Sequence, residues 1–143
     1  MHYKSSVSKV FYVIFPLFII GVFMLHYLAP KREDGNETLI PIIFLPLMIG
    51  IFMLAISKTK YYIEDSILVC QILFYKYKVT IKTIRKIEYN HTVFVSTTTK
   101  LGWDNKGLIV HFNKFDDIFI SPENKEQFIA QLLEINPNIE IKK

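Results

Sequence analysis

The sequence predicts a two-helix transmembrane hairpin followed by a small, β-rich α+β domain. Two long apolar runs, Val10–Ala29 and Leu39–Ile56, contain no Asp, Glu, Lys or Arg. From residue 61 onward, short strand-like patterns follow one another, and a single amphipathic helical pattern comes after them. We therefore divide the 143-residue chain into a membrane hairpin at residues 1–57 and a cytoplasmic domain at residues 58–143.

Each apolar run is long enough to cross a bilayer. A helix rises about 1.5 Å per residue, so transmembrane helices at residues 10–29 and 39–56 cover about 30 Å and about 27 Å. Residues 30–38 then form a short loop that faces outward. A cleaved signal peptide is the alternative for the first run, but the run is long for one and no small-x-small cleavage site follows it.

The basic residues around the two runs indicate how the hairpin is oriented. Each flank and the loop between the runs carry two of them: Lys4 and Lys9, Lys58 and Lys60, and Lys31 and Arg32. Lys and Arg favour the cytoplasmic side, and four of the six lie on the flanks, so both termini are expected in the cytoplasm. The protein is then a multi-pass protein of the cell membrane.

The rest of the chain has the composition of a small mixed domain. Segments rich in β-branched and aromatic residues predict strands at Tyr61–Ile63, Ile67–Phe74, Tyr77–Ile81, a stretch that ends near Tyr89, Thr92–Thr99, Gly107–Phe112 and Phe115–Ile120. Turns are expected at Asp65-Ser66, around Lys82-Thr83 and at Asn113-Lys114. The single cysteine, Cys70, excludes an intramolecular disulfide and is expected to be a small core residue.

One helix should close the domain. Ser121-Pro122-Glu123 has the residue types of a helix start, because serine can cap an orphan amide and proline suits the first helical position. An apolar stripe follows at helical spacing: Phe128, Ile129, Leu132 and Leu133. Asn136-Pro137 should end the helix, and the stripe should pack on the sheet.

This order of strands closed by one C-terminal helix is typical of pleckstrin-homology (PH)-like folds. The residues that support the comparison are Ile84–Glu88, Gly107–Val110, Ile120–Glu123, Phe128, Leu132, Asn136 and Pro137. Over about residues 60–141 the chain resembles the YyaB-like bacterial PH domain family. The resemblance implies an antiparallel sheet or partial barrel capped by a C-terminal helix, with membrane helices ahead of it, and it assigns no site residues. The layout is also similar to that of a bacteriocin immunity protein.

A set of basic residues is the candidate contact with the membrane surface: Lys58, Lys60, Lys76, Lys78, Lys82, Arg85 and Lys86. Each Lys or Arg close to an anionic surface contributes about 1 kcal/mol. The alternative is that these lysines protect exposed strand edges and keep the domain soluble. Of the two interpretations, the sequence favours the second.

No catalytic, metal or cofactor site is expected. His91 and His111 have no partner at metal-ligand spacing, and the adjacent Asp116 and Asp117 point to opposite faces of a strand. Residues 58–143 hold 13 basic and 10 acidic residues, too small an excess to indicate a nucleic-acid partner.

The leading hypothesis is a non-enzymatic, membrane-anchored PH-like binding module at the inner membrane surface. The bilayer is its first expected partner, and a protein, a peptide or an anionic lipid is its expected ligand. Two alternatives stay open. One is a bacteriocin immunity protein, which rests on analogy of layout. The other is a structural subunit of a larger membrane complex.

Overall fold

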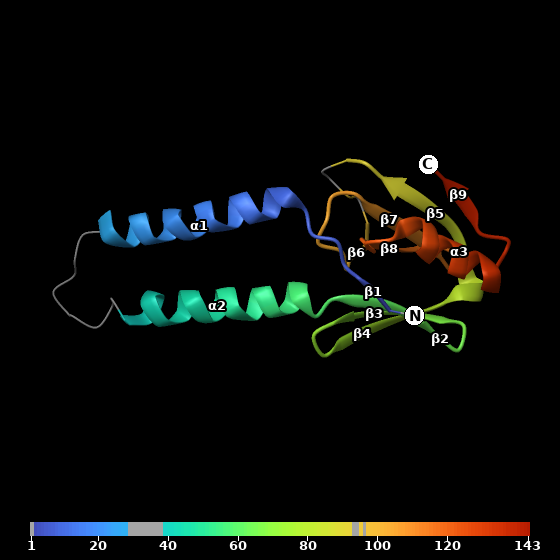
Figure 1. Ribbon diagram of the computed structural model, residues 1–143, viewed down its shortest axis with the longest axis horizontal. Helices are drawn as coiled ribbons and strands as arrows, with labels where there is room; N and C mark the ends of the chain where they lie inside the picture. The colour runs from blue at the N-terminus through green and yellow to red at the C-terminus, as the bar shows by residue number, and fades with distance from the viewer. Residues whose placement is uncertain (1, 29–38, 93–94, 96) are drawn as a thin grey trace. The chain divides into compact units, whose positions relative to one another are not determined.

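A computed structural model describes residues 2–28, 39–92, 95 and 97–143 of the chain (Figure 1). The side chains of residues 25, 26 and 39–43 are not described, and the predicted outward loop at residues 30–38 lies outside the described residues. The chain divides into two compact units. One is Lys9–Leu54, and the other combines Met1–Ser8 with Ala55–Lys143. The sequence prediction had placed residues 1–8 with the hairpin, whereas the structure groups them with the domain.

The first unit consists of two apolar helices, α1 (Lys9–Leu28) and α2 (Leu39–Ser57), each close to its predicted range. The helices contact one another through stacked rings, because Phe52 lies 5.3 Å from both Phe11 and Phe15 between ring centroids. Within the described part of the chain, no helix meets the length and apolarity required of a membrane span. The transmembrane part of the predicted fold therefore stays a prediction.

The domain contains two sheets. The first has the order β1-β2-β3-β4 and is antiparallel throughout, with strands β1 (His2–Lys4), β2 (Lys60–Glu64), β3 (Ile67–Ile72) and β4 (Tyr75–Thr80). The second has the order β6-β8-β7-β5-β9, with strands β5 (Ile84–Asn90), β6 (Thr99–Lys100), β7 (Gly107–Phe112), β8 (Asp116–Ile120) and β9 (Glu140–Lys142). A 3₁₀ turn, η1 (Ile81–Thr83), connects the sheets, and helix α3 (Lys125–Ile135) follows β8.

Most of the predicted strands are confirmed, and the differences have simple physical causes. The meander from β2 to β4 and the hairpin from β7 to β8 stand where the sequence placed them. Strands β1 and β9 were missed, because three residues are too few to show a two-residue period. In the predicted strand Thr92–Thr99, only Thr99 belongs to a strand among the described positions.

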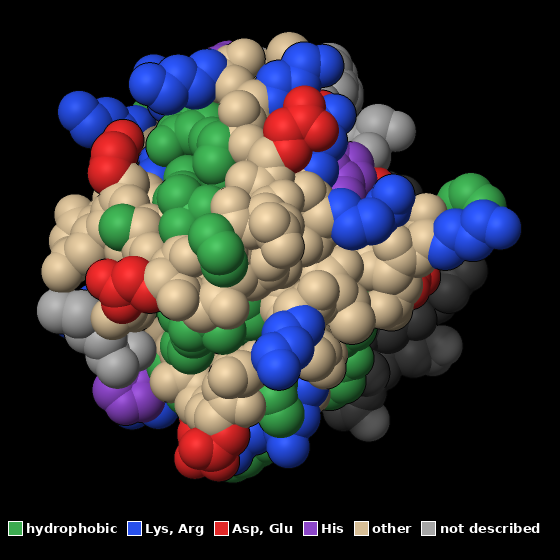
Figure 2. All heavy atoms as spheres, turned by 90° about the vertical axis from the view of Figure 1, so that its right-hand side faces the viewer, with side chains coloured by type: hydrophobic (Ala, Val, Ile, Leu, Met, Phe, Trp, Pro, Cys, Tyr) green, Lys and Arg blue, Asp and Glu red, His purple; other side chains and the backbone are tan. Residues whose placement is uncertain are grey.

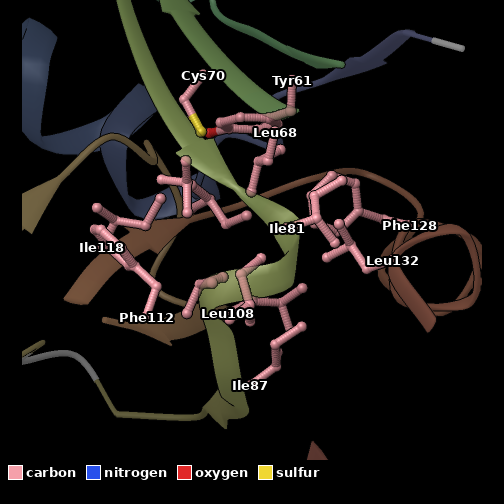
Figure 3. Close-up of a cluster of buried hydrophobic side chains, with 14 of the residues drawn as sticks. Tyr61, Leu68, Cys70, Ile81, Ile87, Leu108, Phe112, Ile118, Phe128 and Leu132 are labelled. Carbon is pink, nitrogen blue, oxygen red and sulfur yellow. The ribbon is translucent and has the colours of Figure 1, made fainter. Parts of the chain in front are cut away.

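The core lies between the sheets and α3 (Figure 3). Tyr61, Leu68 and Cys70 come from the first sheet, and Phe128 and Leu132 come from α3, all fully buried. Cys70 is confirmed as a core residue, and burial raises the pKa of its thiol to about 12. A thiol in this environment stays protonated at neutral pH, so Cys70 acts as a small apolar side chain.

The predicted start of the helix is wrong by about one turn. The N-cap of α3 is Asn124, and Ser121 does not cap it. Ser121 is instead fully buried and forms a hydrogen bond with Ser5, a residue 116 positions away in the sequence. The predicted end at Asn136 is confirmed, because its backbone N–H bonds to Leu132 and its side-chain amide donates to the carbonyl oxygens of Ile81 and Ile84 at 3.0 Å each.

The turn between β3 and β4 holds a leucine in a strained backbone conformation. Leu73 has a φ of 51°, a left-handed conformation that costs an L-residue about 1–2 kcal/mol and that glycine adopts freely. Replacing Leu73 with glycine should therefore raise the free energy of unfolding by about 0.5–1 kcal/mol, after allowance for the greater entropy of the unfolded glycine chain. Phe74, which lacks a positive φ, provides the control: Phe74→Gly should lower stability. Urea titration in detergent checks both variants, and a loss of stability in Leu73→Gly would contradict the claim that the Leu73 backbone is strained.

Candidate functional site

The register of the first sheet places lysines side by side across its four strands. Lys4 pairs with Lys60, Lys60 with Gln71, and Gln71 with Lys76. Side chains at directly paired positions point to the same face, so this row carries three ammonium groups. The next row on that face contains His2, Tyr62, Val69 and Lys78. We call this surface, defined by His2, Lys4, Lys60, Lys76 and Lys78, the basic face.

The basic face points away from the core. The row between the two lysine-bearing rows consists of Tyr3, Tyr61, Cys70 and Tyr77, whose side chains are buried or packed against the core. Because side chains alternate along a strand, the flanking rows point to the opposite face of the sheet, where Val69 is covered at 2% exposure and the lysines surround it. Lys4, Lys76 and Lys78 are exposed, and Lys60 is half-buried with its Nζ 5.8 Å from the centre of the Tyr62 ring.

The charges of the basic face are not neutralised within the domain. Its four strands carry four lysines and one acidic residue, Glu64, which lies in the row farthest from Lys60. Among the residues that the structure describes, none of the four lysines forms an ion pair with a carboxylate. The face is therefore an uncompensated positive surface that suits anionic groups.

The structure brings together only part of the predicted basic set. Lys60, Lys76 and Lys78 lie on the basic face, and Lys58 is exposed in the connection between α2 and β2. The other three lie elsewhere: Lys82 is in η1, Arg85 and Lys86 are in β5. Sequence reasoning missed His2 and Lys4, because nothing in a three-residue strand signals its pairing with a strand some 60 positions later.

Two of the separated residues have partners of their own. Arg85 donates from Nη2 to the carbonyl oxygen of Lys114 at 2.9 Å. Lys86 forms a salt bridge with Glu88, which also lies 3.4 Å from His111 and 3.7 Å from Lys142. The hydrogen bond from Lys86 contributes most to holding the pKa of Glu88 below its usual value. These contacts compensate charge locally, so this part of the second sheet resembles an ordinary polar surface.

Basic residues also occur outside the basic face. Figure 2 shows Lys and Arg side chains distributed around one side of the molecule, with Asp and Glu side chains among them. The basic face differs in its register, which aligns three lysines in one row without a carboxylate, while Glu64 lies on the same face two rows away. Within the described residues, no group of three or more His, Cys, Asp or Glu side chains is placed to hold a metal ion.

A buried polar network ties the segments that adjoin both helices to the domain. The Tyr61 hydroxyl lies 3.0 Å from Ser5 Oγ and 2.8 Å from the carbonyl oxygen of Leu101, and it accepts from the Ser121 N–H at 3.2 Å. Burial raises the pKa of Tyr61 to about 12, so the hydroxyl keeps its proton. Ser5 precedes α1, and its Oγ lies 2.9 Å from Ser121 Oγ. We call this set, together with the contacts of Trp103 below, the junction network.

Trp103 extends the junction network to the end of α2. Its indole Nε1 donates to Thr59 Oγ1 at 2.8 Å, and Thr59 Oγ1 donates to the Ala55 carbonyl oxygen at 2.7 Å. The Trp103 backbone N–H donates to Ser121 Oγ at 3.0 Å, and its carbonyl oxygen accepts from the Ser8 N–H at 3.2 Å. The chain before α1 and the chain after α2 are therefore both bonded to one loop of the domain.

Comparison with known protein families matches residues 59–136 to the family described as bacterial PH domain. No curated protein and no solved structure matches the chain significantly. The match begins one residue before β2 and ends just after α3, so β1, both long helices and β9 lie outside it. It confirms the resemblance at the level of the family, while the YyaB-like subfamily stays a prediction. Because the match covers more than half of the chain, this protein belongs to the bacterial PH domain family.

Proposed function

We propose that this protein is a non-enzymatic binding module of the cell membrane, in which α1 and α2 span the bilayer and the basic face contacts anionic phospholipid headgroups. PH domains are generally binding modules rather than enzymes, so membership of the family supports an interaction role. The row formed by Lys4, Lys60 and Lys76 is the observation that carries the choice of ligand.

The surfaces of the two helices support the membrane anchor. Apolar side chains point outward along both of them, including Ile14, Leu17, Phe18, Leu47 and Ile51, which are 48–63% exposed. Transferring one such side chain from water to an apolar medium contributes about 1.5–3 kcal/mol. A bilayer would cover these side chains on every side of the hairpin.

The pairing of β1 with β2 supports an even number of membrane crossings between them. It precedes α1 and pairs with β2, which follows α2, so the two flanks of the hairpin meet in one sheet. A chain that crosses a bilayer twice returns to the side from which it started, as this pairing requires. Cleavage of the first run as a signal peptide would remove β1 from the sheet, which disfavours that alternative.

Chain connectivity supports a short distance between the basic face and the headgroups. Lys60 follows Ser57, the last residue of α2, by three positions, and Lys4 precedes Lys9 by five. A chain extends by at most about 3.6 Å per residue, so the Cα of Lys60 lies within about 11 Å of the Cα of Ser57. With α2 in the bilayer, Lys60 cannot leave the neighbourhood of the headgroups, and the register brings Lys76 into the same row.

A lipid titration of the full chain tests the choice of ligand. Purified protein in neutral detergent is titrated with fluorescent phosphatidylglycerol and, separately, with fluorescent phosphatidylcholine. The native chain should prefer phosphatidylglycerol, and added salt should reduce the preference because salt screens exposed charges. In the variant Lys4→Gln/Lys60→Gln/Lys76→Gln, the affinity for phosphatidylglycerol should fall by up to about 150-fold, at about 1 kcal/mol per lysine.

A second triple variant separates the basic face from net charge. Lys82→Gln/Lys106→Gln/Lys114→Gln removes the same number of charges from exposed positions outside the basic face. It should keep most of the preference for phosphatidylglycerol. An equal loss in both variants, or no preference in the native chain, would overturn the assignment of the basic face. The immunity and structural-subunit alternatives gain no supporting observation from the fold or the comparisons and stay predictions.

A further inference from the structure

One hairpin turn of the domain carries apolar residues at its tip. The β2–β3 turn is formed by Asp65 and Ser66, residue types that suit tight turns. The β3–β4 turn is formed by Leu73 and Phe74. Phe74 is 97% exposed, more than any other large hydrophobic side chain among those described. A fully exposed phenylalanine at a turn has no role in the core of the domain.

The Leu73–Phe74 turn also contains a residue type that is uncommon in its backbone conformation. Leu73 has a φ of 51°, in the range where Asp65, Ser66 and Asn113 hold the other positive-φ turn positions. Polar residues and glycine are the usual occupants of this conformation, and a bulky apolar residue there is uncommon. Strain of this kind often marks a functional site, because a residue better suited to the backbone would serve the fold alone equally well.

The register places the Leu73–Phe74 turn at one particular end of the first sheet. Strand β3 is antiparallel to β2, so β3 ends where β2 begins, which is where the chain arrives from α2. Strand β1 also ends there, where the chain leaves toward α1. The Ile72–Tyr75 pair lies directly beyond the row that contains Lys60 and Lys76. The exposed phenylalanine therefore lies at the end of the sheet that carries both connections to the helices.

A second exposed phenylalanine belongs to a turn of the second sheet and lies near the opposite end of the first sheet. Phe115, 82% exposed, is in the β7–β8 turn, where the Asn113 N–H donates to the Thr83 carbonyl oxygen at 3.1 Å. Thr83 follows the end of β4, whose last residue, Thr80, pairs with Ile67 at the start of β3. Phe115 thus has similar exposure and chemistry but a different location, which makes it a matched control.

We propose that the Leu73–Phe74 turn inserts into the interfacial layer of the bilayer, with Lys60 and Lys76 beside it among the headgroups. Aromatic side chains favour the membrane interface, and an apolar tip flanked by basic residues combines hydrophobic insertion with attraction to anionic lipid. This inference rests on the proposed function, because it requires the helices to be in the bilayer. It adds a third point of attachment, which fixes how the domain lies on the surface.

Single-cysteine labelling of the full chain tests the insertion. The variants Phe74→Cys and Phe115→Cys are labelled with the environment-sensitive fluorophore NBD and reconstituted into vesicles of phosphatidylcholine and phosphatidylglycerol. The native Cys70 is fully buried and does not compete for the label. NBD at position 74 should be quenched by spin-labelled lipid and protected from aqueous iodide, and NBD at position 115 should show the reverse. Tyr75→Cys, at the same end of the sheet, repeats the measurement at a second position.

Flotation of the same samples separates the two proposals. If the protein fails to float with the vesicles, the membrane anchor itself fails, and with it the insertion. If it floats but position 74 is quenched by iodide as readily as position 115, only the insertion is overturned. If position 74 is protected from both quenchers, a protein surface covers the turn and the insertion is likewise overturned. Protection from iodide together with quenching by lipid, at position 74 and not at 115, supports it.

Discussion

Tyr61→Ala should lower the free energy of unfolding of the domain by about 4 kcal/mol or more. Tyr61 is fully buried, and truncating a large aromatic side chain in a core typically costs 3–5 kcal/mol through lost burial and the cavity left behind. The variant also removes the hydroxyl at the centre of the junction network, which leaves the Ser121 N–H and the Leu101 carbonyl without this partner. Small domains are stable by about 5–15 kcal/mol, so the loss is a large share of the total.

Tyr61→Phe isolates the hydroxyl from the ring. It keeps the packing, and leaving buried polar groups unsatisfied should cost about 1–3 kcal/mol. Tyr62→Phe is the matched control, because Tyr62 is the next residue of β2 and its side chain lies on the opposite, outer face. Its effect should stay within about 0.5 kcal/mol. Fluorescence of Trp103, the single tryptophan, follows urea unfolding in detergent, and equal losses in Tyr61→Phe and Tyr62→Phe would contradict the role of the network.

Gly107→Ala should destabilise the domain by about 3 kcal/mol. Gly107 is buried at the start of β7, and a Cβ at this position would lie 2.5 Å from the carbonyl oxygen of Ile120 and in contact with the Phe119 ring. A ring can turn, but the carbonyl belongs to the neighbouring strand β8 and cannot retreat without breaking the pairing. Overpacking of a close-packed interior costs about 1–3 kcal/mol, and a backbone clash belongs at the upper end of that range.

Gly50→Ala provides the control for Gly107→Ala. Gly50 lies in α2, and apart from its chain neighbours and the adjoining helix backbone, no atom of the described residues lies within 4 Å of the position of its Cβ. The same chemical change there should leave the urea unfolding of the domain unchanged. A loss below about 1 kcal/mol for Gly107→Ala would mean that β7 and β8 separate more easily than their tight approach indicates.

The sequence predicts the local parts of this fold well. The meander from β2 to β4 and helix α3 each carry a repeated signal, in the form of β-branched and aromatic runs or an apolar stripe. The end of α3 at Asn136 follows from the proline behind it. These features depend on residues that are neighbours in the chain, and neighbours are what a sequence pattern records.

The candidate site could not be predicted in the same way. Lys82, Arg85 and Lys86 lie close together in the sequence, yet they fall outside the basic face. Lys4 and Lys60 are 56 positions apart and pair in the row that carries three of its lysines. Ser121 shows the same limit, because its sequence surroundings suit a helix cap while its actual partner is Ser5. Pairing between distant segments is decided by register and burial, which one sequence does not display.

The position of β1 has a consequence for the order in which the chain folds. Bringing Lys4 to Lys60 closes a loop of the 55 residues between them, which for a flexible chain costs about 3–4 kcal/mol of entropy. Once α1 and α2 have paired through Phe11, Phe15 and Phe52, most of that loop is already ordered and its ends have been brought together. Docking of β1 onto β2 is therefore thermodynamically coupled to pairing of the helices, and this edge strand of the first sheet should form more readily once the hairpin has formed.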